Sequence, residues 1–376
     1  MNILAIFTAL SIIIIPVCGI LKLNPPVWYG QYIGLIFCSF LGISLSLWKF
    51  NKYISIFTII CLLNTFFVAH FAARAMLLLF QVYISCLAIY GISKFNQKQR
   101  KYVLYGILTI FGLSCFYLVV QYFNKDPFFF STLSHNRDEL VAFFGAKDQL
   151  GSFFALTAPI AYFFNPYLSI LSILGLFISH SSFAFVSAII SLGLYVSITN
   201  KNKIKYLIVG LFIVGVLFFR YGDDVSIADF GTRGAVWNEA IKDVFKQRIT
   251  IGSQEVKGSL INGYGLGNFL NIFPYIEGQG KFNYSNEKFT HAHNDYIEVF
   301  SDLGLLGLLS ILILLFNFVY RFIKSKKNKE LVCLFCSIIA YLLNASGNFL
   351  THLAYSGAFL IILVGLYEAT RRELNG

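Results

Sequence analysis

The chain has 376 residues, of which 57% are hydrophobic and only 12% are charged, and its formal net charge at pH 7 is +11. Apolar runs of about 18 residues or more recur along its whole length, and this composition excludes a soluble protein. We attribute the excess of basic residues to membrane topology and contact with anionic lipids. Membrane lipids are therefore expected partners, and nucleic acid is not.

Twelve membrane spans are the most economical division of the sequence, which predicts an all-α integral membrane protein with a single polytopic domain over residues 1–376. The spans are expected at about 3–22, 27–47, 53–72, 75–93, 102–123, 149–165, 168–180, 182–198, 204–220, 296–320, 331–350 and 354–370. The seventh and eighth are short, so they form either two helices or one bent unit around His180.

Basic residues in short loops determine which side of the membrane each loop occupies. More than half of the lysines and arginines fall on the inner side when both termini are cytoplasmic, so we predict an N-in, C-in orientation. Two polar segments then lie outside: a first outer loop at 124–148 and a large periplasmic loop at 221–295. Loops of this length are usually functional or disordered.

The large loop carries two patterns. Trp237 and Phe245 belong to a set of apolar residues at helical spacing, which predicts an amphipathic helix over about 232–247 on the membrane surface. Arg233 falls in the expected first turn, where a guanidinium and free backbone N–H groups favour a phosphate; an ordinary solvated arginine is the alternative. Further on, Gly263–Gly267 supplies a flexible turn where the backbone can approach a ligand.

A polar histidine cluster at the start of the tenth span is the strongest candidate for chemistry. His291 and His293 stand where water meets the span, and histidine is the side chain whose charge changes near neutral pH. Either residue is therefore a candidate general base, and an interfacial polar role is the alternative.

The same span continues with polar residues and glycines at regular spacing. Asn294, Glu298 and Asp302 follow at steps of four, which predicts that their side chains lie along one helix face. Gly304 and Gly307 are expected to leave a smooth patch where another helix approaches closely.

Three features combine into a resemblance. Arg233 with Trp237, the Gly263–Gly267 turn, and the pattern His293-Asn294-x9-Gly304-x-x-Gly307 together resemble the O-antigen ligase/polymerase (Wzy-type) superfamily of bacterial membrane glycosyltransferases. The plan of the chain is also similar, with about twelve spans and a large extracytoplasmic loop before the signature helix. The resemblance therefore implies a GT-C-like fold.

The resemblance implies a specific activity. A glycan would pass from undecaprenyl diphosphate to an acceptor hydroxyl at the periplasmic face of the inner membrane, with inversion at the anomeric carbon and without a metal or other cofactor. His293 would be the general base, with His291 as its rival. Arg233 would hold the diphosphate, with Trp237 also in the substrate site. The resemblance assigns an orienting role to the remaining polar residues of the signature helix: Asn294, Glu298 and Asp302.

One position departs from the family pattern. Many ligases carry a second arginine in a Ser-Arg-Gly-like turn at the start of a mid-chain span, and here the matching place reads Ser179-His180-Ser181. We expect His180, or Arg137 and Lys147 from the first outer loop, to supply that cation.

The resemblance leaves the acceptor open. A ligase uses the lipid A–core of lipopolysaccharide, a polymerase uses another carrier-linked glycan, and a related protein O-glycosyltransferase uses an amino-acid side chain. We favour the ligase, because the single large loop and the compact His-Asn signature look more like it. A membrane transporter is the alternative outside the enzymes, but the middle of the spans is nearly free of ionisable residues.

Overall fold

A computed structural model gives the fold, and it describes residues 40, 43–45, 47–123, 140–144, 147–200, 205, 227–246, 248–251, 254–272, 291–348, 350–352 and 354–376. The spans expected at 3–22, 27–47 and 204–220 lie wholly or mostly outside these residues, as do most of the first outer loop and Arg137. The chain divides into two compact units: unit 1 comprises 1–21, 91–227 and 325–376, and unit 2 comprises 22–90 and 228–324.

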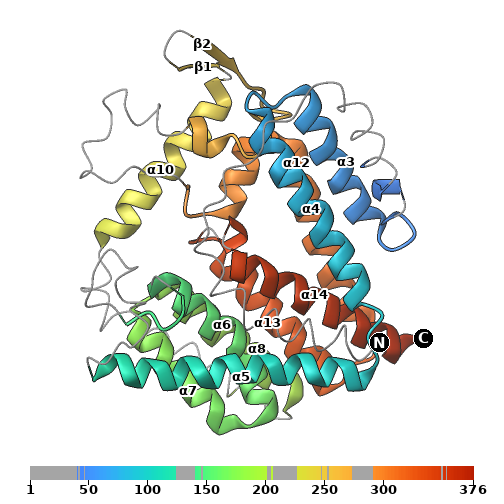
Figure 1. The fold of residues 1–376 in the computed structure, drawn as a ribbon, viewed down its shortest axis with the longest axis vertical. Coiled ribbons are helices and arrows are strands. Elements are labelled where there is room, and N and C mark those ends of the chain that lie inside the picture. Colours follow the sequence, from blue (N-terminus) through green and yellow to red (C-terminus); the bar gives the residue numbers. More distant parts are fainter. Residues whose placement is uncertain are drawn as a thin grey trace. The chain divides into compact units, whose positions relative to one another are not determined.

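Helices make up most of the described chain (Figure 1). They are α3 (Lys52–Phe67), α4 (Ala72–Ile92), α5 (Gln97–Tyr122), α6 (Lys147–Phe164), α7 (Pro166–Ser179), α8 (Ser182–Thr199), α10 (Ile227–Lys246), α12 (Asp295–Lys324), α13 (Lys329–Asn344), the short 3-10 helix η3 (Leu350–His352) and α14 (Ala354–Asn375). The seventh and eighth expected spans are two separate helices, because α7 ends at His180 in the left-handed conformation.

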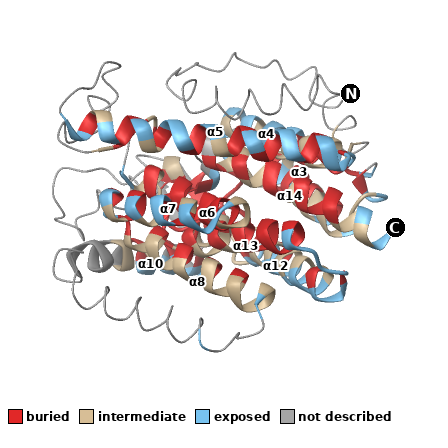
Figure 2. Ribbon diagram, turned by 90° about the horizontal axis from the view of Figure 1, so that it is seen from below, coloured by how far each residue is buried: buried red, intermediate tan, exposed pale blue. Residues whose placement is uncertain are grey.

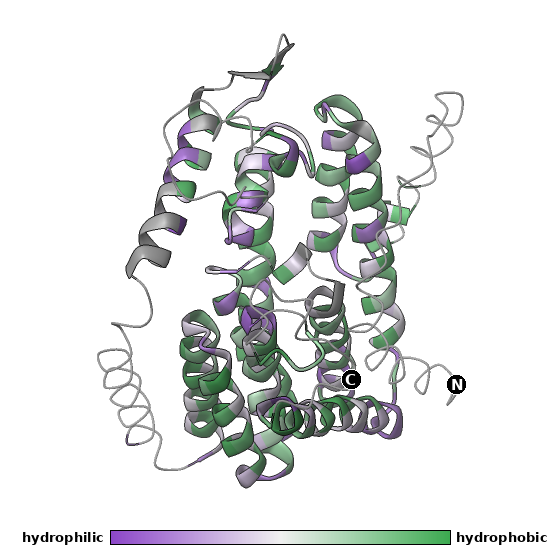
Figure 3. Ribbon diagram, turned by 60° about the vertical axis from the view of Figure 1, so that its left-hand side comes forward, coloured by the Kyte–Doolittle hydropathy of each residue, from purple (hydrophilic) through white to green (hydrophobic). Residues whose placement is uncertain are grey.

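Most residues of these helices are hydrophobic (Figure 3). Within the described part of the chain, four helices are long and apolar enough to cross a membrane: α4 over Ala73–Ile92, α5, α8 and α12. Helices α3 and α7 are apolar but shorter. The chain is therefore a mainly helical multi-pass membrane protein, and the total of twelve spans stays a prediction.

Unit 1 is built around α6, which packs against α7, α8 and α13. Helices α6 and α13 are buried over most of their length (Figure 2). Small and polar residues allow this close approach, as is usual between membrane helices. Gly175 of α7 leaves the space that the Phe154 ring occupies, and Asn344 of α13 donates a hydrogen bond to Ser152 of α6 (2.8 Å).

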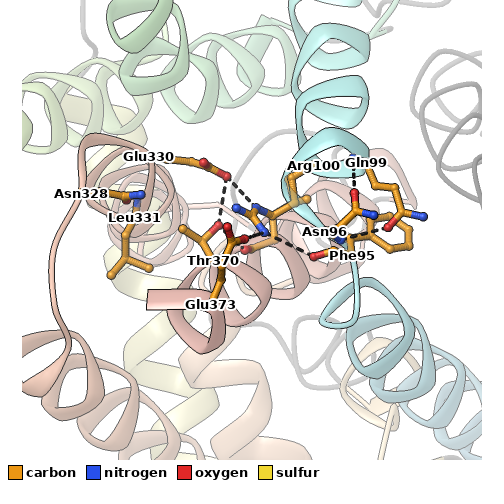
Figure 4. A network of polar contacts seen from close by, with 10 residues as sticks. Phe95, Asn96, Gln99, Arg100, Asn328, Glu330, Leu331, Thr370 and Glu373 are labelled. Carbon is orange, nitrogen blue, oxygen red and sulfur yellow. Dashed lines mark hydrogen bonds and ion pairs between the residues drawn. The ribbon is translucent and has the colours of Figure 1, made fainter. Parts of the chain in front are cut away.

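A buried ionic network joins the ends of three unit 1 helices (Figure 4). Arg100 of α5 has only 2% of its side chain exposed, and it donates from Nε to Glu330 at the start of α13 (2.8 Å). Its Nη1 donates to Glu373 of α14 (2.6 Å) and to the carbonyl of Phe95 (3.3 Å). Thr370 donates to the same Glu330 oxygen (3.0 Å), so Arg100 and Glu330 each have more than one partner.

Removing the cation from this network should destabilise the protein. Arg100→Met leaves the carboxylate of Glu330 buried without its main partner, and we expect a loss of about 3 kcal/mol in unfolding free energy. Lys98→Met, at an exposed position of the same helix, is the matched control with little expected effect. Denaturant unfolding of the full-length protein in detergent measures both variants. Equal stability of the two would contradict a stabilising role for the network.

The core of unit 2 contains a cluster shared by α3, α4 and α12. Its fully or nearly buried members are Cys61, Leu62, Ala75, Leu79, Tyr83, Leu266 and Leu303. Helix α12 also packs along α3. These contacts hold the start of α12, which carries the histidine cluster, against a rigid helical pair.

Helix α12 is broken at Gly304, where the backbone adopts φ 64° and ψ −157°. The segment Ser259–Gly265 fills the break. Tyr264 and Gly265 donate their N–H groups to the carbonyls of Ser301 and Asp302 (both 2.9 Å). On the other side of the break, Leu305 and Leu306 donate to the carbonyls of Leu260 and Ile261 (2.9 and 3.1 Å), so the interrupted helical bonds are replaced.

The expectation that Gly304 and Gly307 form a smooth patch for another helix is therefore wrong. A Cβ at Gly304 would lie 2.4 Å from the carbonyl oxygen of Ile261, so this glycine admits a loop, not a helix. A Cβ at Gly307 would lie 2.1 Å from the Cβ of Leu303, so the second glycine accommodates the kink within α12 itself.

A two-stranded antiparallel hairpin follows α10 and departs from the all-α expectation. Strand β1 (Arg248–Ile251) pairs with β2 (Gln254–Lys257), with Arg248 opposite Lys257 and Ile251 opposite Gln254. Val256 of β2 packs into a cluster with Val244 of α10 and Phe300 of α12. The hairpin thus links α10 to the signature helix.

Candidate active site

The histidine cluster lies in unit 2 beside α10 and the segment that follows the Gly263–Gly267 turn. Ala292, between the two histidines, is fully buried in a cluster with Val236 and Ala240 of α10 and with Phe269. The sequence predicts a candidate site around these histidines, and the fold brings three separate parts of the chain to it.

Both backbone groups of Ala292 are held by side chains. Trp237 of α10 donates its indole N–H to the carbonyl of Ala292 (2.7 Å). The N–H of Ala292 donates to Oε1 of Glu298, which lies one turn inside α12 (2.7 Å). The residue between His291 and His293 is therefore fixed from two helices, which restricts where the imidazoles stand.

His293 occupies a conformation that few side chains adopt. Its φ is 51°, in the left-handed region, and the residue is half-buried. Asn294 follows as the cap of α12, and its Oδ1 accepts the N–H groups of Tyr296 and Ile297 (3.0 and 3.2 Å). Strained residues that the surrounding structure fixes this firmly are concentrated at functional sites.

His291 is paired with a carboxylate. Its Nδ1 lies 3.0 Å from Oε1 of Glu298, the same oxygen that binds the Ala292 N–H, and the Glu298 side chain is only 2% exposed. Because a carboxylate accepts hydrogen bonds, Nδ1 of His291 carries the hydrogen and its Nε2 has the lone pair when the ring is neutral. Glu298 thus organises the turn between the two histidines.

Asp302 has a different set of contacts. Its two carboxylate oxygens accept the N–H groups of Gly267 (2.6 Å) and Phe269 (2.8 Å), and the residue is 5% exposed. The glycine turn, where an approach to a ligand was expected, therefore directs the Gly267 N–H to Asp302, and Phe269 supplies the second donor just after the turn. This pair of bonds fixes the turn against α12, two helical turns from the histidines.

Arg233 lies on α10, half-buried and one turn before Trp237. Helical spacing places it on the same face as Trp237, which contacts the Ala292 carbonyl. The expected position in the first turn of the helix is wrong, because α10 begins at Ile227 and Arg233 falls in its second turn.

Two candidate cations belong to unit 1. Lys147 opens α6 and is exposed; His180 ends α7 with φ 49° and is also exposed. A Cβ at Gly151 of α6 would lie 2.7 Å from the Cβ of Ser181, so the first turns of α6 pack against the turn that carries His180. Their part in substrate binding stays a prediction.

Sequence reasoning missed Asn64 of α3. This residue is 5% exposed; its Nδ2 donates to the carbonyl of Asn262 (2.7 Å) and its Oδ1 accepts the N–H of Leu266 (2.6 Å). It therefore holds both ends of the Gly263–Gly267 turn. The sequence offered one sign of this role: Asn64 is a polar residue inside an expected membrane span, and such residues usually make specific contacts.

Comparison with known families adds an independent finding. Residues 167–312 match the family model described as O-antigen ligase. The matched range contains α10 with Arg233 and Trp237, the glycine turn, and the start of α12 with His291 and His293. No curated protein matches the chain.

Proposed function

The chain carries a domain of the O-antigen ligase superfamily, and from this premise we propose that it transfers a glycan from undecaprenyl diphosphate to the lipid A–core of lipopolysaccharide. The transfer would take place at the periplasmic face of the inner membrane, in the N-in, C-in orientation. The anchored turn His291–Asn294 is the observation that supports an enzyme best, because it places two imidazoles at the start of a membrane helix.

In the proposed mechanism, His293 accepts the proton of the acceptor hydroxyl while the hydroxyl oxygen forms a bond to the anomeric carbon. The bond from that carbon to the diphosphate breaks on the opposite face, so the configuration inverts and the electron pair leaves with the diphosphate. Arg233 stabilises the negative charge of the leaving group. The protein cations take the place of a metal ion in this scheme.

The strained backbone favours His293 over His291 as the base. Glu298 and Trp237 hold the intervening Ala292, and the Asn294 cap fixes the other side of His293. His291 is paired with Glu298 at Nδ1, so it helps to hold the turn and remains the rival base. The polymerase and the protein O-glycosyltransferase use the same carrier-linked donor and differ in the acceptor.

Deletion of the gene followed by electrophoresis of lipopolysaccharide tests the proposed acceptor. Loss of a ligase should leave bare core while carrier-linked polymer accumulates. Core bearing a single repeat unit would instead identify a polymerase. A normal banding pattern would contradict both, and would direct attention to glycosylated proteins.

Glu298 should act through its acceptor oxygen and not through its charge. Glu298→Gln keeps an Oε1 that accepts from Ala292 and His291, so we expect nearly unchanged transfer. Glu298→Ala releases the turn and should lower kcat by up to about a hundredfold with little change in KM for the acceptor, because the base is misplaced. Steady-state kinetics of both variants provide the comparison. Equal losses in the two variants would contradict a positioning role.

A further inference from the structure

Arg74, in the first turn of α4, is a cation without a partner in the described part of unit 2. The residue is half-buried, and its Nε is covered by protein and donates to no acceptor among the described residues. A covered guanidinium donor without an acceptor costs free energy, so such an arrangement is uncommon unless a further group completes it.

Arg74 lies beside the glycine turn. A Cβ at Gly267 would lie 2.2 Å from Cδ1 of Leu78 and 3.6 Å from Cγ of Arg74, so the turn lies directly on this face of α4, and the φ of 72° at Gly267 favours glycine there. The neighbouring Asn268 is fully buried, and its Oδ1 also meets no donor among the described residues. Arg74 is therefore not paired with this amide.

The same stretch connects Arg74 to the histidine cluster. Gly267 contacts α4, and Phe269, two residues further on, packs against the buried Ala292. Asp302 binds the N–H groups of both Gly267 and Phe269, which fixes the stretch at each end. Three residues span at most about 10 Å, so the stretch joins the face of α4 beside Arg74 to the buried Ala292 over a short path.

We infer that Arg74 binds a phosphate group of the lipid-linked donor, as a cation in addition to Arg233. This inference rests on the proposed function. An arginine suits the role because its planar fork matches phosphate oxygens and keeps its charge at all relevant pH values. Arg74 lies outside residues 167–312, so the family match does not cover it.

An anionic phospholipid headgroup is a second possible ligand, because it carries a phosphate group as the donor does. Arg74 stands at the start of a helix long enough to cross a membrane, where headgroups lie. We assign the donor diphosphate as the ligand because the fixed stretch leads from Arg74 to Ala292, between the two histidines. The two sources are separable by adding each lipid to the same protein.

The test uses the full-length protein in phosphatidylcholine nanodiscs and follows thermal unfolding with added undecaprenyl diphosphate or phosphatidylglycerol. For Arg74→Gln we expect the half-saturating concentration of undecaprenyl diphosphate to rise about tenfold or more. The control Lys257→Gln, at an exposed position of unit 2, should bind as the wild type does. Without lipid, Arg74→Gln should be no less stable than the wild type, since an unpartnered cation is removed.

Unchanged binding of undecaprenyl diphosphate by Arg74→Gln would overturn the inference about Arg74 but not the proposed function. Reduced stability of the lipid-free variant with unchanged binding would identify a structural arginine and also overturn it. Loss of phosphatidylglycerol binding only would assign the residue to a headgroup. A wild-type protein that undecaprenyl diphosphate does not stabilise would contradict the proposed function itself.

Discussion

Replacement of His293 by asparagine is expected to lower glycan transfer by about 10²–10⁴-fold, the usual contribution of a general base. Asparagine tolerates the left-handed backbone that His293 adopts, so the turn should keep its shape while the imidazole is lost. The protein should insert and accumulate at the normal level. Complementation of a deletion strain, with electrophoresis of the glycosylated acceptor and immunoblotting of the protein, measures both quantities.

His291→Ala is the informative comparison for this result. Loss of the His291 ring removes one of the two hydrogen bonds to Glu298, but the bond from the Ala292 N–H remains. We therefore expect a partial loss, smaller than that of His293→Asn. If His291→Ala abolishes transfer while His293→Asn retains it, the base is His291.

Replacement of Gly304 by alanine should prevent stable folding, with an expected loss of at least about 4 kcal/mol. The backbone angles of Gly304 lie in a region that is essentially restricted to glycine, which alone costs about 1–3 kcal/mol. In addition, the new Cβ would meet the carbonyl of Ile261 at 2.4 Å and the N–H of Gly263 at 2.5 Å. Both contacts are with backbone, so no side chain can move aside.

Gly193→Ala is the matched control. Gly193 lies inside α8, where an added Cβ meets nothing within 4 Å, and alanine is favoured over glycine in a helix by about 1 kcal/mol. Size-exclusion profiles and unfolding midpoints in detergent should therefore separate the two variants. A Gly304→Ala protein as stable as the wild type would show that Ser259–Gly265 does not fill the break in α12.

Local patterns were sufficient for the helices but not for their interruptions. The apolar stretches that became α4, α5 and α12 are visible because length and hydropathy are local properties. The glycines at 263 and 304 are also visible, yet their contact joins residues about forty positions apart. A sequence pattern carries no information about such a contact, so Gly304 was assigned to helix packing.

Two other differences between expectation and structure are the start of α10 and the β1–β2 hairpin. The amphipathic helix was expected to begin at about 232, next to Gly231, but α10 begins at Ile227 and continues through this glycine. The hairpin had a signal, since Gly252 and Ser253 separate two short stretches that contain β-branched residues, Ile249–Ile251 and Val256. The apolar composition of the chain favoured an all-α prediction, so these two four-residue strands were not predicted.

For the candidate site, the sequence indicated candidate residues but not the contacts between them. The sequence assigned the polar residues after His293 to one orienting face, whereas Glu298 binds the histidine turn and Asp302 binds the glycine turn. The assignment of Trp237 to the substrate site stays a prediction, and the contact of its N–H with the carbonyl of Ala292 was not foreseen. The contact between Trp237 and Ala292 depends on how α10 packs beside the start of α12, and the spacing of residues within α12 gives no information about that packing.

The most direct measurement is single-turnover transfer by the purified protein in liposomes that contain an undecaprenyl-diphosphate-linked glycan and a lipid A–core acceptor. The wild type should release one carrier diphosphate for each glycan transferred, and His293→Asn should bind the donor but transfer almost nothing. Transfer by His293→Asn at the wild-type rate, or none by the wild type, would contradict the assignment of this turn as the catalytic centre.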